Sequence, residues 1–205
     1  LLGPDGSGKS TLSRSLAEHY QLFFKKFPIR TRNLYFGWKP FLPTTKIISK
    51  LFQKREYKIV NESNQKEQSF SLFQELVFCY YFIEYISKYL FYIFPRRWNK
   101  EVILVDRYFY DLAAHYRYAE KSKLLPLLIK LYPRPDFTFV LDSEPEILQQ
   151  RKKEMALDQL AEHRKRYIAL RSRIPLTIIP TSKTIADCGN QIIEHSWETI
   201  LRRVG

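Results

Sequence analysis

Apolar runs rich in β-branched residues alternate with helical patterns along this chain. Three of the runs pass directly into charged or hydroxyl residues, and they span 101–108 (EVILVDRY), 137–145 (FTFVLDSEP) and 176–182 (LTIIPTS). A short apolar run bounded in this way is typical of a strand buried in a parallel sheet. Another strand is predicted within 24–40 (FKKFPIRTRNLYFGWKP), running into a loop that contains Pro40 and Pro43.

Helical periodicity connects these runs. Apolar residues recur every four positions over 12–20, and a final helix is predicted from about Thr184 to Arg203. A long helix is predicted at roughly 68–94, after a basic and then polar stretch at 44–66 that we expect to form an exposed helix and connection. Strands that alternate with helices predict an α/β domain with a parallel sheet covered on both faces.

The aromatic run at 76–94 (LVFCYYFIEYISKYLFYIF) has the length of a membrane span. Glu84 and Lys88 lie in its middle, where charge is costly in lipid, and their spacing of four suits an ion pair on one helix face. We therefore predict a helix packed inside the domain rather than a transmembrane segment. Aromatic residues at helical spacing within it are interpreted as core rather than as a surface that stacks on a base: Tyr80, Tyr81, Phe82 and Tyr85.

The composition favours anionic binding partners but does not identify one. The 205 residues suit a single domain, and 34 Lys+Arg against 21 Asp+Glu give a net charge of +13. Such a balance favours nucleotides, phosphorylated sugars, nucleic acid or an acidic membrane face. No nucleic-acid-binding module is recognisable, so we expect no specific nucleic-acid partner.

The cysteines and histidines carry no metal or disulfide pattern. Cys79 and Cys188 are too few and too far apart for a disulfide framework or a zinc site. His115, His163 and His195 lack metal-binding spacing. With no secretory signal visible, we expect a reducing, cytoplasmic setting.

The most specific feature is the opening stretch LLGPDGSGKST, in which Gly3, Gly8, Lys9 and Ser10 complete the phosphate-binding pattern G-x-x-x-x-G-K-[ST]. Its glycines allow successive backbone N–H groups to point inward and cradle a polyphosphate. Only Leu1 and Leu2 stand where a strand should precede the loop, so we expect the first strand to be truncated and the chain to begin inside a longer sequence.

This pattern predicts a nucleoside triphosphate site. Lys9 would reach the β- and γ-phosphates, Ser10 would offer its hydroxyl to Mg²⁺, and the following helix would direct its positive N-terminus at the same phosphates. The residues expected to hold the nucleotide are Gly3, Asp5, Gly6, Ser7, Gly8, Lys9, Ser10 and Thr11.

Two charged residues that follow the apolar run at 102–105, and one acid inside the loop, are also candidates for the site. Asp106, at the end of an apolar run, could hold Mg²⁺ directly or through water, and Arg107 could grip a second phosphate with two hydrogen bonds. The alternative is an ion pair that caps a strand. Asp5 could orient the acceptor or a metal-bound water, or it could form an Asx-type turn.

A basic segment at 151–167 (RKKEMALDQLAEHRKRY) is either a solvated helix face or a closing lid. We favour the lid, because phosphoryl transfer between two anions requires cations around the moving group.

Taken together, GPDGSGKST, a strand ending in DRY, and LDSEPEILQQRKKE resemble the thymidylate kinase family of nucleoside monophosphate kinases over nearly the whole chain. The resemblance implies a P-loop kinase fold, a three-layer α/β/α sandwich around a five-stranded parallel sheet. It further implies a single domain over 1–205 with a short lid at about 150–165, assembled as a homodimer. The implied reaction transfers the γ-phosphoryl group of ATP to an acceptor phosphate, with Mg²⁺.

The resemblance also assigns site residues. The family has an acid at the position of Asp5, and its DRY motif matches Asp106, Arg107 and Tyr108. Because Gly6 stands where other members have an arginine, the catalytic arginine is expected in the lid. Arg151 is the leading candidate, followed by Lys152, Lys153 and Arg164.

Two departures leave the acceptor open. The family's arginine on the long helix is absent from VFCYYFIEY, and its arginine-glutamate-proline element is absent as well. The chain is closer to a divergent branch associated with cell-surface polysaccharide genes. The sequence is thus compatible with a kinase of a dTMP-like nucleotide, a kinase of a sugar or surface-polysaccharide precursor, or an ATP-binding regulatory module with little turnover.

Overall fold

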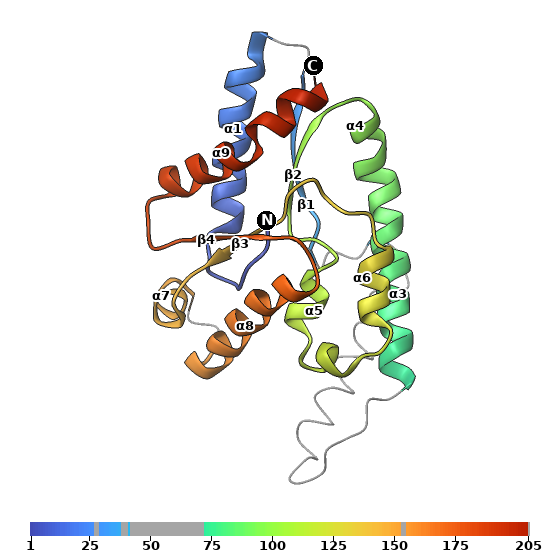
Figure 1. Cartoon of the computed structure of the whole chain (residues 1–205). Coiled ribbons are helices and arrows are strands. Elements are labelled where there is room, and N and C mark those ends of the chain that lie inside the picture. The colour runs from blue at the N-terminus through green and yellow to red at the C-terminus, as the bar shows by residue number, and fades with distance from the viewer. Residues whose placement is uncertain (27–28, 38–40, 42–71, 153–154, 205) are drawn as a thin grey trace.

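The computed structural model describes residues 1–26, 29–37, 41, 72–152 and 155–204 (Figure 1). The exposed helix and connection expected at 44–66, and the loop with Pro40 and Pro43, lie outside these residues.

In the part of the chain that the structure describes, four short strands form two parallel pairs. The first pair joins β1 (Thr31–Tyr35) to β2 (Val102–Asp106), and the second joins β3 (Phe139–Asp142) to β4 (Thr177–Pro180). Each strand lies inside a run that the sequence predicts to be extended. Because β1 and β2 end together at Tyr35 and Asp106, the chain that follows β2 emerges at one edge of the sheet.

The predicted P-loop kinase sandwich around a five-stranded parallel sheet is wrong, because the described residues form two sheets of two strands each. Leu1 and Leu2, expected as the end of the first strand, supply only one bridge, between Leu2 and Val140. Two residues are too few for a ladder. Beside them, between β2 and β3, lies a largely apolar cavity of about 480 Å³.

Leu1 and Leu2 are nevertheless bonded to both sheets through their backbones. The N-terminal amine of Leu1 donates to Val105 O at 2.6 Å, and Arg107 N donates to Leu1 O at 3.0 Å. On the other side, Leu2 N donates to Phe139 O at 2.8 Å. The segment that enters the glycine-rich loop is thereby anchored between the end of β2 and the start of β3.

Helices account for most of the described chain (Figure 1). The α-helices are α1 (Lys9–Phe23), α3 (Leu72–Lys88), α4 (Phe94–Trp98), α5 (Asp111–His115), α6 (Leu125–Leu131), α7 (Pro145–Arg151), α8 (Leu157–Ala169) and α9 (Ile185–Val204). Short 3₁₀ turns occupy Phe24–Lys26, Arg117–Lys121 and Leu170–Ser172, and a π-helical segment occupies Tyr89–Ile93.

The start of α9 illustrates how local sequence sets a boundary. Asp187 N donates to Thr184 Oγ1 at 3.2 Å, while Thr184 N donates to Asp187 Oδ2 at 3.3 Å. This reciprocal pair satisfies N–H groups that have no partner within the first turn. The observed helix agrees with the prediction from about Thr184 to Arg203.

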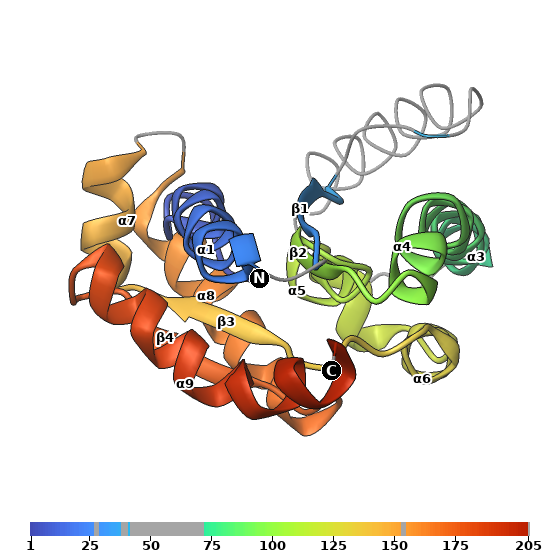
Figure 2. The same ribbon diagram turned by 90° about the horizontal axis from the view of Figure 1, so that it is seen from above.

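Two cores lie on opposite faces of the strands. Val102 and Leu104 belong to a core under α1 and α9, whereas Ile103 and Val105 face a core built by α3, α5, α6 and α8. Successive strand residues point to opposite faces, so near-continuous apolar runs can serve both cores. Figure 2 shows α1 on one side of β1 and β2, with α3 and α4 on the other.

The long helix predicted at 68–94 continues as α3, the π-helical segment and α4 to Trp98 (Figure 1). The predicted ion pair is confirmed, with Lys88 Nζ 2.9 Å from Glu84 Oε1 and both side chains buried. Tyr81 and Tyr85 are also buried, in agreement with their interpretation as core. Within the described residues, every helix is too short or too polar to cross a membrane.

Candidate functional site

The glycine-rich loop approaches β3 so closely that a side chain is excluded at its first glycine. A Cβ on Gly3 would lie 2.6 Å from Leu141 O, and the φ of Gly3 is +142°. Helix α1 begins directly after Gly8, with Leu12 N donating to Gly8 O at 2.9 Å. Glycine has no side chain with which to cap the helix, so the first N–H groups of α1 face the loop. An anion bound there would meet these groups and the positive end of the helix.

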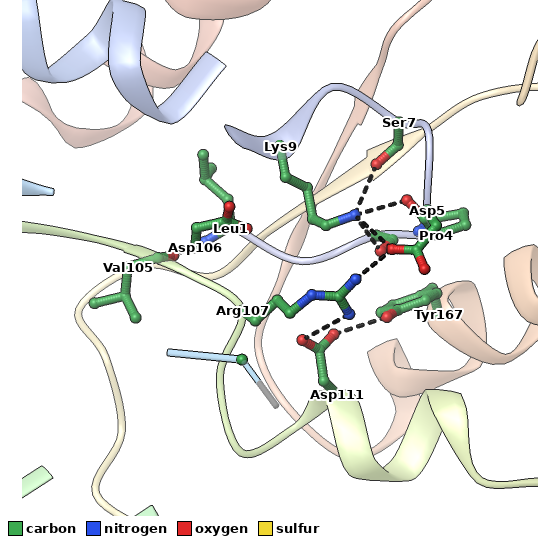
Figure 3. Close-up of polar contacts among 12 residues, drawn as sticks. Leu1, Pro4, Asp5, Ser7, Lys9, Val105, Asp106, Arg107, Asp111 and Tyr167 are labelled. Atoms are coloured by element: carbon green, nitrogen blue, oxygen red, sulfur yellow. Dashed lines mark hydrogen bonds and ion pairs between the residues drawn. The ribbon is translucent and has the colours of Figure 1, made fainter. Parts of the chain in front are cut away.

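Lys9 folds back into the loop rather than into solvent (Figure 3). Its Nζ donates to Gly3 O at 2.8 Å and to Pro4 O at 2.7 Å, and lies 4.0 Å from Asp5 Oδ1. Burial, reinforced by the nearby charge of Arg107, lowers the pKa of Lys9 to about 8. The ammonium group therefore lies in the concavity of the loop, where polyphosphate oxygens could replace the carbonyls as its partners.

Ser10 and Asp106 meet across the site. The hydroxyl of Ser10 donates to Asp106 Oδ2 at 2.6 Å, although the two residues come from α1 and the end of β2. Asp106 is buried, and its Oδ1 has no hydrogen-bond partner among the described residues. A hydroxyl and an unsatisfied carboxylate are oxygen ligands of the kind that Mg²⁺ prefers, so this pair fits the predicted metal site.

The described chain contains no group of three or more His, Cys, Asp or Glu residues that could hold a metal by itself. A magnesium ion beside Ser10 and Asp106 would thus need phosphate oxygens and water to complete its coordination. That is the usual arrangement where the ion arrives with a nucleotide.

Arg107 lies directly after the strand, with a positive φ of 70°, and its guanidinium points at the loop. NH2 pairs with Asp5 Oδ1, whereas NH1 lies 3.6 Å from Asp111 Oδ2. Burial raises the pKa of Asp5, but the charges of Arg107 and Lys9 outweigh burial and hold that pKa below its ordinary value. Asp5 is therefore a charged partner of Arg107 in this structure.

These elements surround a cavity of about 610 Å³, within the range of small-molecule sites. Predicted site residues that line it are Asp5, Gly6, Ser7, Gly8, Lys9, Ser10, Thr11, Asp106, Arg107, Arg151 and Lys152. The structure thus brings the loop, the end of β2 and the end of α7 to one opening.

Arg151, the leading lid candidate, is the last residue of α7 and reaches over the loop. Its NH1 lies 3.5 Å from Gly6 O and its NH2 3.5 Å from Thr181 O. A Cβ on Gly6 would lie 3.3 Å from Leu148 O, so the loop packs against α7. Lys153 lies outside the described residues, and a closing motion at about 150–165 stays a prediction.

Arg164 does not contribute to the cavity wall. Its Nε and NH2 donate to the two carboxylate oxygens of Asp142 at 2.7 and 2.9 Å, and its NH1 donates to Glu144 Oε2 at 2.6 Å. A two-pronged pair of this kind is strong and geometrically fixed. Arg164 therefore joins α8 to the end of β3, instead of offering a cation to a phosphate as the sequence suggested.

Sequence reasoning missed the residues behind Arg107. Asp111 is fully buried on α5, and Tyr167 on α8 donates its hydroxyl to Asp111 Oδ1 at 2.8 Å. The spacing of four between Arg107 and Asp111 could have indicated the first contact. Nothing near Tyr167 in the sequence could have indicated the second. Tyr108, the last residue of the DRY run, points away and donates to Pro133 O at 2.8 Å.

A scan against protein-family models and a search of curated proteins each found no match to this chain.

Proposed function

We propose that this protein transfers the γ-phosphoryl group of Mg-ATP to a phosphorylated acceptor, with a nucleoside monophosphate similar to dTMP preferred, in the manner of the thymidylate kinase family. The observation that carries the proposal is the arrangement at the loop. A buried lysine occupies the loop's concavity while the next residue, Ser10, bonds to the strand-end carboxylate of Asp106. This combination matches the parts that phosphoryl-transfer sites use for a triphosphate and its metal.

In this proposal each loop group has one task. The backbone N–H groups at the start of α1 and the ammonium of Lys9 would bind the β- and γ-phosphates. Ser10 and Asp106 would hold Mg²⁺, which when bound neutralises charge on the phosphate oxygens.

Two arginines support a transferase over a passive ATP-binding module. Arg107 and Arg151 reach the same cavity from β2 and α7. A site that only holds ATP has no need for cations directed at a second phosphate, whereas transfer between two anions does. Arg107 would bind the acceptor phosphate, and Arg151 would stabilise charge on the moving group.

One observation favours a second candidate, a kinase of a phosphorylated sugar or surface-polysaccharide precursor. The stretch VFCYYFIEY has no arginine, and the cation further along α3, Lys88, is engaged with Glu84 and with Gly37 O at 3.2 Å. Within its described residues, α3 thus lacks the arginine with which the family contacts a nucleotide acceptor.

A screen of acceptors with Mg-ATP, following ADP release, tests the proposal. The panel comprises dTMP, other nucleoside monophosphates and phosphorylated sugars, with Lys9→Ala as the inactive control. Stimulation by a nucleoside monophosphate is expected. Stimulation by phosphorylated sugars alone would select the second candidate, and tight ATP binding without any stimulation would indicate a regulatory module. Failure to bind ATP would overturn all three.

The proposal also covers the cellular location and the oligomeric state of the protein. A reducing, cytoplasmic location is supported by Cys79 and Cys188, which are both free thiols. Assembly as a homodimer rests on the family resemblance and is tested by light scattering on the purified chain.

A further inference from the structure

Behind Arg107 lies a buried acid that the proposed chemistry does not use. Asp111 is fully buried in the first turn of α5. Burial raises its pKa, while the charges of Arg107 and Lys9 act in the opposite direction. A buried carboxylate is destabilising unless it is paired, so its presence calls for a physical reason.

Its partners supply that reason. Asp111 Oδ2 lies 3.6 Å from Arg107 NH1, and Oδ1 accepts a 2.8 Å hydrogen bond from Tyr167. Arg107 is buried too, and its backbone is in the left-handed region at a φ of 70°. Non-glycine residues rarely adopt this conformation, so the surroundings must hold Arg107 in place.

The two acids that contact Arg107 differ in exposure. The side chain of Asp5 is 37% exposed and lines the cavity, whereas that of Asp111 is 1% exposed and lies on the opposite side of the guanidinium (Figure 3). An anion that enters the cavity can therefore replace Asp5 as a partner, but it cannot reach Asp111.

We propose that Asp111 and Tyr167 are positioning residues that fix the guanidinium of Arg107 toward the cavity, so that an acceptor phosphate exchanges with Asp5 without moving the arginine. Tyr167 acts through Asp111, because its hydroxyl orients the carboxylate. A preorganised cation binds a phosphate more tightly than one that must first be ordered. The role in acceptor binding rests on the proposed function, whereas the positioning of Arg107 does not.

Chemical modification of arginine tests the positioning without any substrate. The full-length protein is treated with phenylglyoxal, and the rate at each arginine is measured by peptide mass spectrometry. In Asp111→Asn, which keeps the side-chain shape and removes the charge, Arg107 should react at least about fivefold faster than in wild type. Tyr167→Phe removes only one hydroxyl and should give about a twofold increase.

Two controls separate positioning from loosening of the fold. Arg166 is as buried as Arg107 and precedes Tyr167 on α8, so its reaction rate reports any loosening of the fold around Tyr167. If the effect is one of positioning, the rate at Arg166 should not change. Tyr85→Phe removes an equally buried hydroxyl that has no hydrogen-bond partner among the described residues, so it should leave Arg107 unaffected. An unchanged Arg107 rate in both test variants, or equal acceleration of Arg107 and Arg166, would overturn the proposal.

A kinetic measurement then connects positioning to function. With any acceptor that the screen identifies, Tyr167→Phe should raise the KM for the acceptor about fivefold and leave the KM for ATP within twofold. Equal increases in both would contradict the role. If no acceptor is found and Arg107 still becomes reactive in Asp111→Asn, the proposed function fails while the positioning stands.

Discussion

The glycine-rich loop at residues 3–10 and the basic segment at 151–167 both suggest a function from sequence, yet they fold very differently. In the loop, Lys9 and Ser10 both direct their side chains at the site. In the basic segment, Arg151 approaches the loop, whereas Arg164 is fully engaged with Asp142 and Glu144. A motif of fixed spacing therefore predicts where its side chains point, whereas a cluster of similar charges does not.

The difference has a local cause. Residues 3 to 10 are joined by a few peptide bonds, and the glycines at positive φ allow the tight turn that brings Lys9 inward. An arginine in a helix has a long flexible side chain, and the acids that capture Arg164 lie 20 and 22 residues away. The following variants test this contrast, in order of decreasing effect.

Lys9→Ala should have the largest effect, a loss of about 10³-fold in phosphoryl transfer, because the cation at the centre of the loop is removed. The measurement is ADP release with the best acceptor, alongside circular dichroism to check the fold. Lys165→Ala, at an exposed position of α8, is the matched control. Transfer at the wild-type rate by Lys9→Ala would refute the loop assignment.

Asp106→Asn should lower transfer about 10²-fold, since the amide keeps a hydrogen bond to Ser10 but loses the charge that attracts Mg²⁺. A magnesium titration of ADP release should show a higher half-saturating concentration than in wild type. An unchanged magnesium requirement would remove Asp106 from the metal site.

Arg151→Ala and Arg164→Ala should have opposite effects. Arg151→Ala is expected to lower transfer about 10-fold with little loss of stability, because the side chain is exposed and its contacts are long. Arg164→Ala should lower the free energy of unfolding by about 2 kcal/mol and leave transfer nearly intact, because it deprives two acids of their partner. Urea unfolding and ADP release measure the two quantities. The reverse outcome would make Arg164 the lid cation.

The smallest effect concerns acid stability. Burial, followed by the nearby His115, lowers the pKa of His163 from 6.5 to about 4. The unfolded chain thus binds this proton between those values while the folded chain does not, so acid favours unfolding. His163→Asn should lose less stability than wild type between pH 7 and pH 4.5, on the order of 1 kcal/mol for a partly exposed ring.

Parallel urea titrations at the two pH values measure this effect, with His195→Asn at an exposed position of α9 as the control. Equal acid sensitivity of wild type and His163→Asn would exclude His163 as the cause.

The strands were predictable, but their assembly was not. The β-branched runs around Val102–Asp106, Phe139–Asp142 and Thr177–Pro180 indicated strands from composition alone. The five-stranded sheet failed because a continuous sheet depends on pairing between distant segments. Here Leu2 forms a single bridge, to Val140, between the two described sheets.

The long helix was located correctly but ends later than predicted. Pro95 lies in the first turn of α4, directly after the π-helical segment. Proline is tolerated in the first turn of a helix, where its missing N–H would have no partner. The chain can therefore continue as a helix to Trp98, although proline usually signals a boundary.

The candidate site was likewise predictable only in part. The spacing of residues within the loop and the position of Asp106 after an apolar run are both visible in the sequence. The contact between Asp111 and Tyr167 joins residues 56 positions apart, so it depends on how α5 packs against α8. Packing of this kind follows from the whole core and leaves no local pattern.

The close approach of Gly6 to α7 limits how this site could be rebuilt. An arginine at position 6 would have to tolerate a φ of +85° and a Cβ 3.3 Å from Leu148 O. Exchanging Gly6 and Arg151 in one step would therefore strain the loop and at the same time remove the cation from the end of α7. A loop that carries an arginine and a neighbouring helix that carries it are thus separated by a rearrangement of the backbone, and an engineer would have to shift α7 before moving the charge.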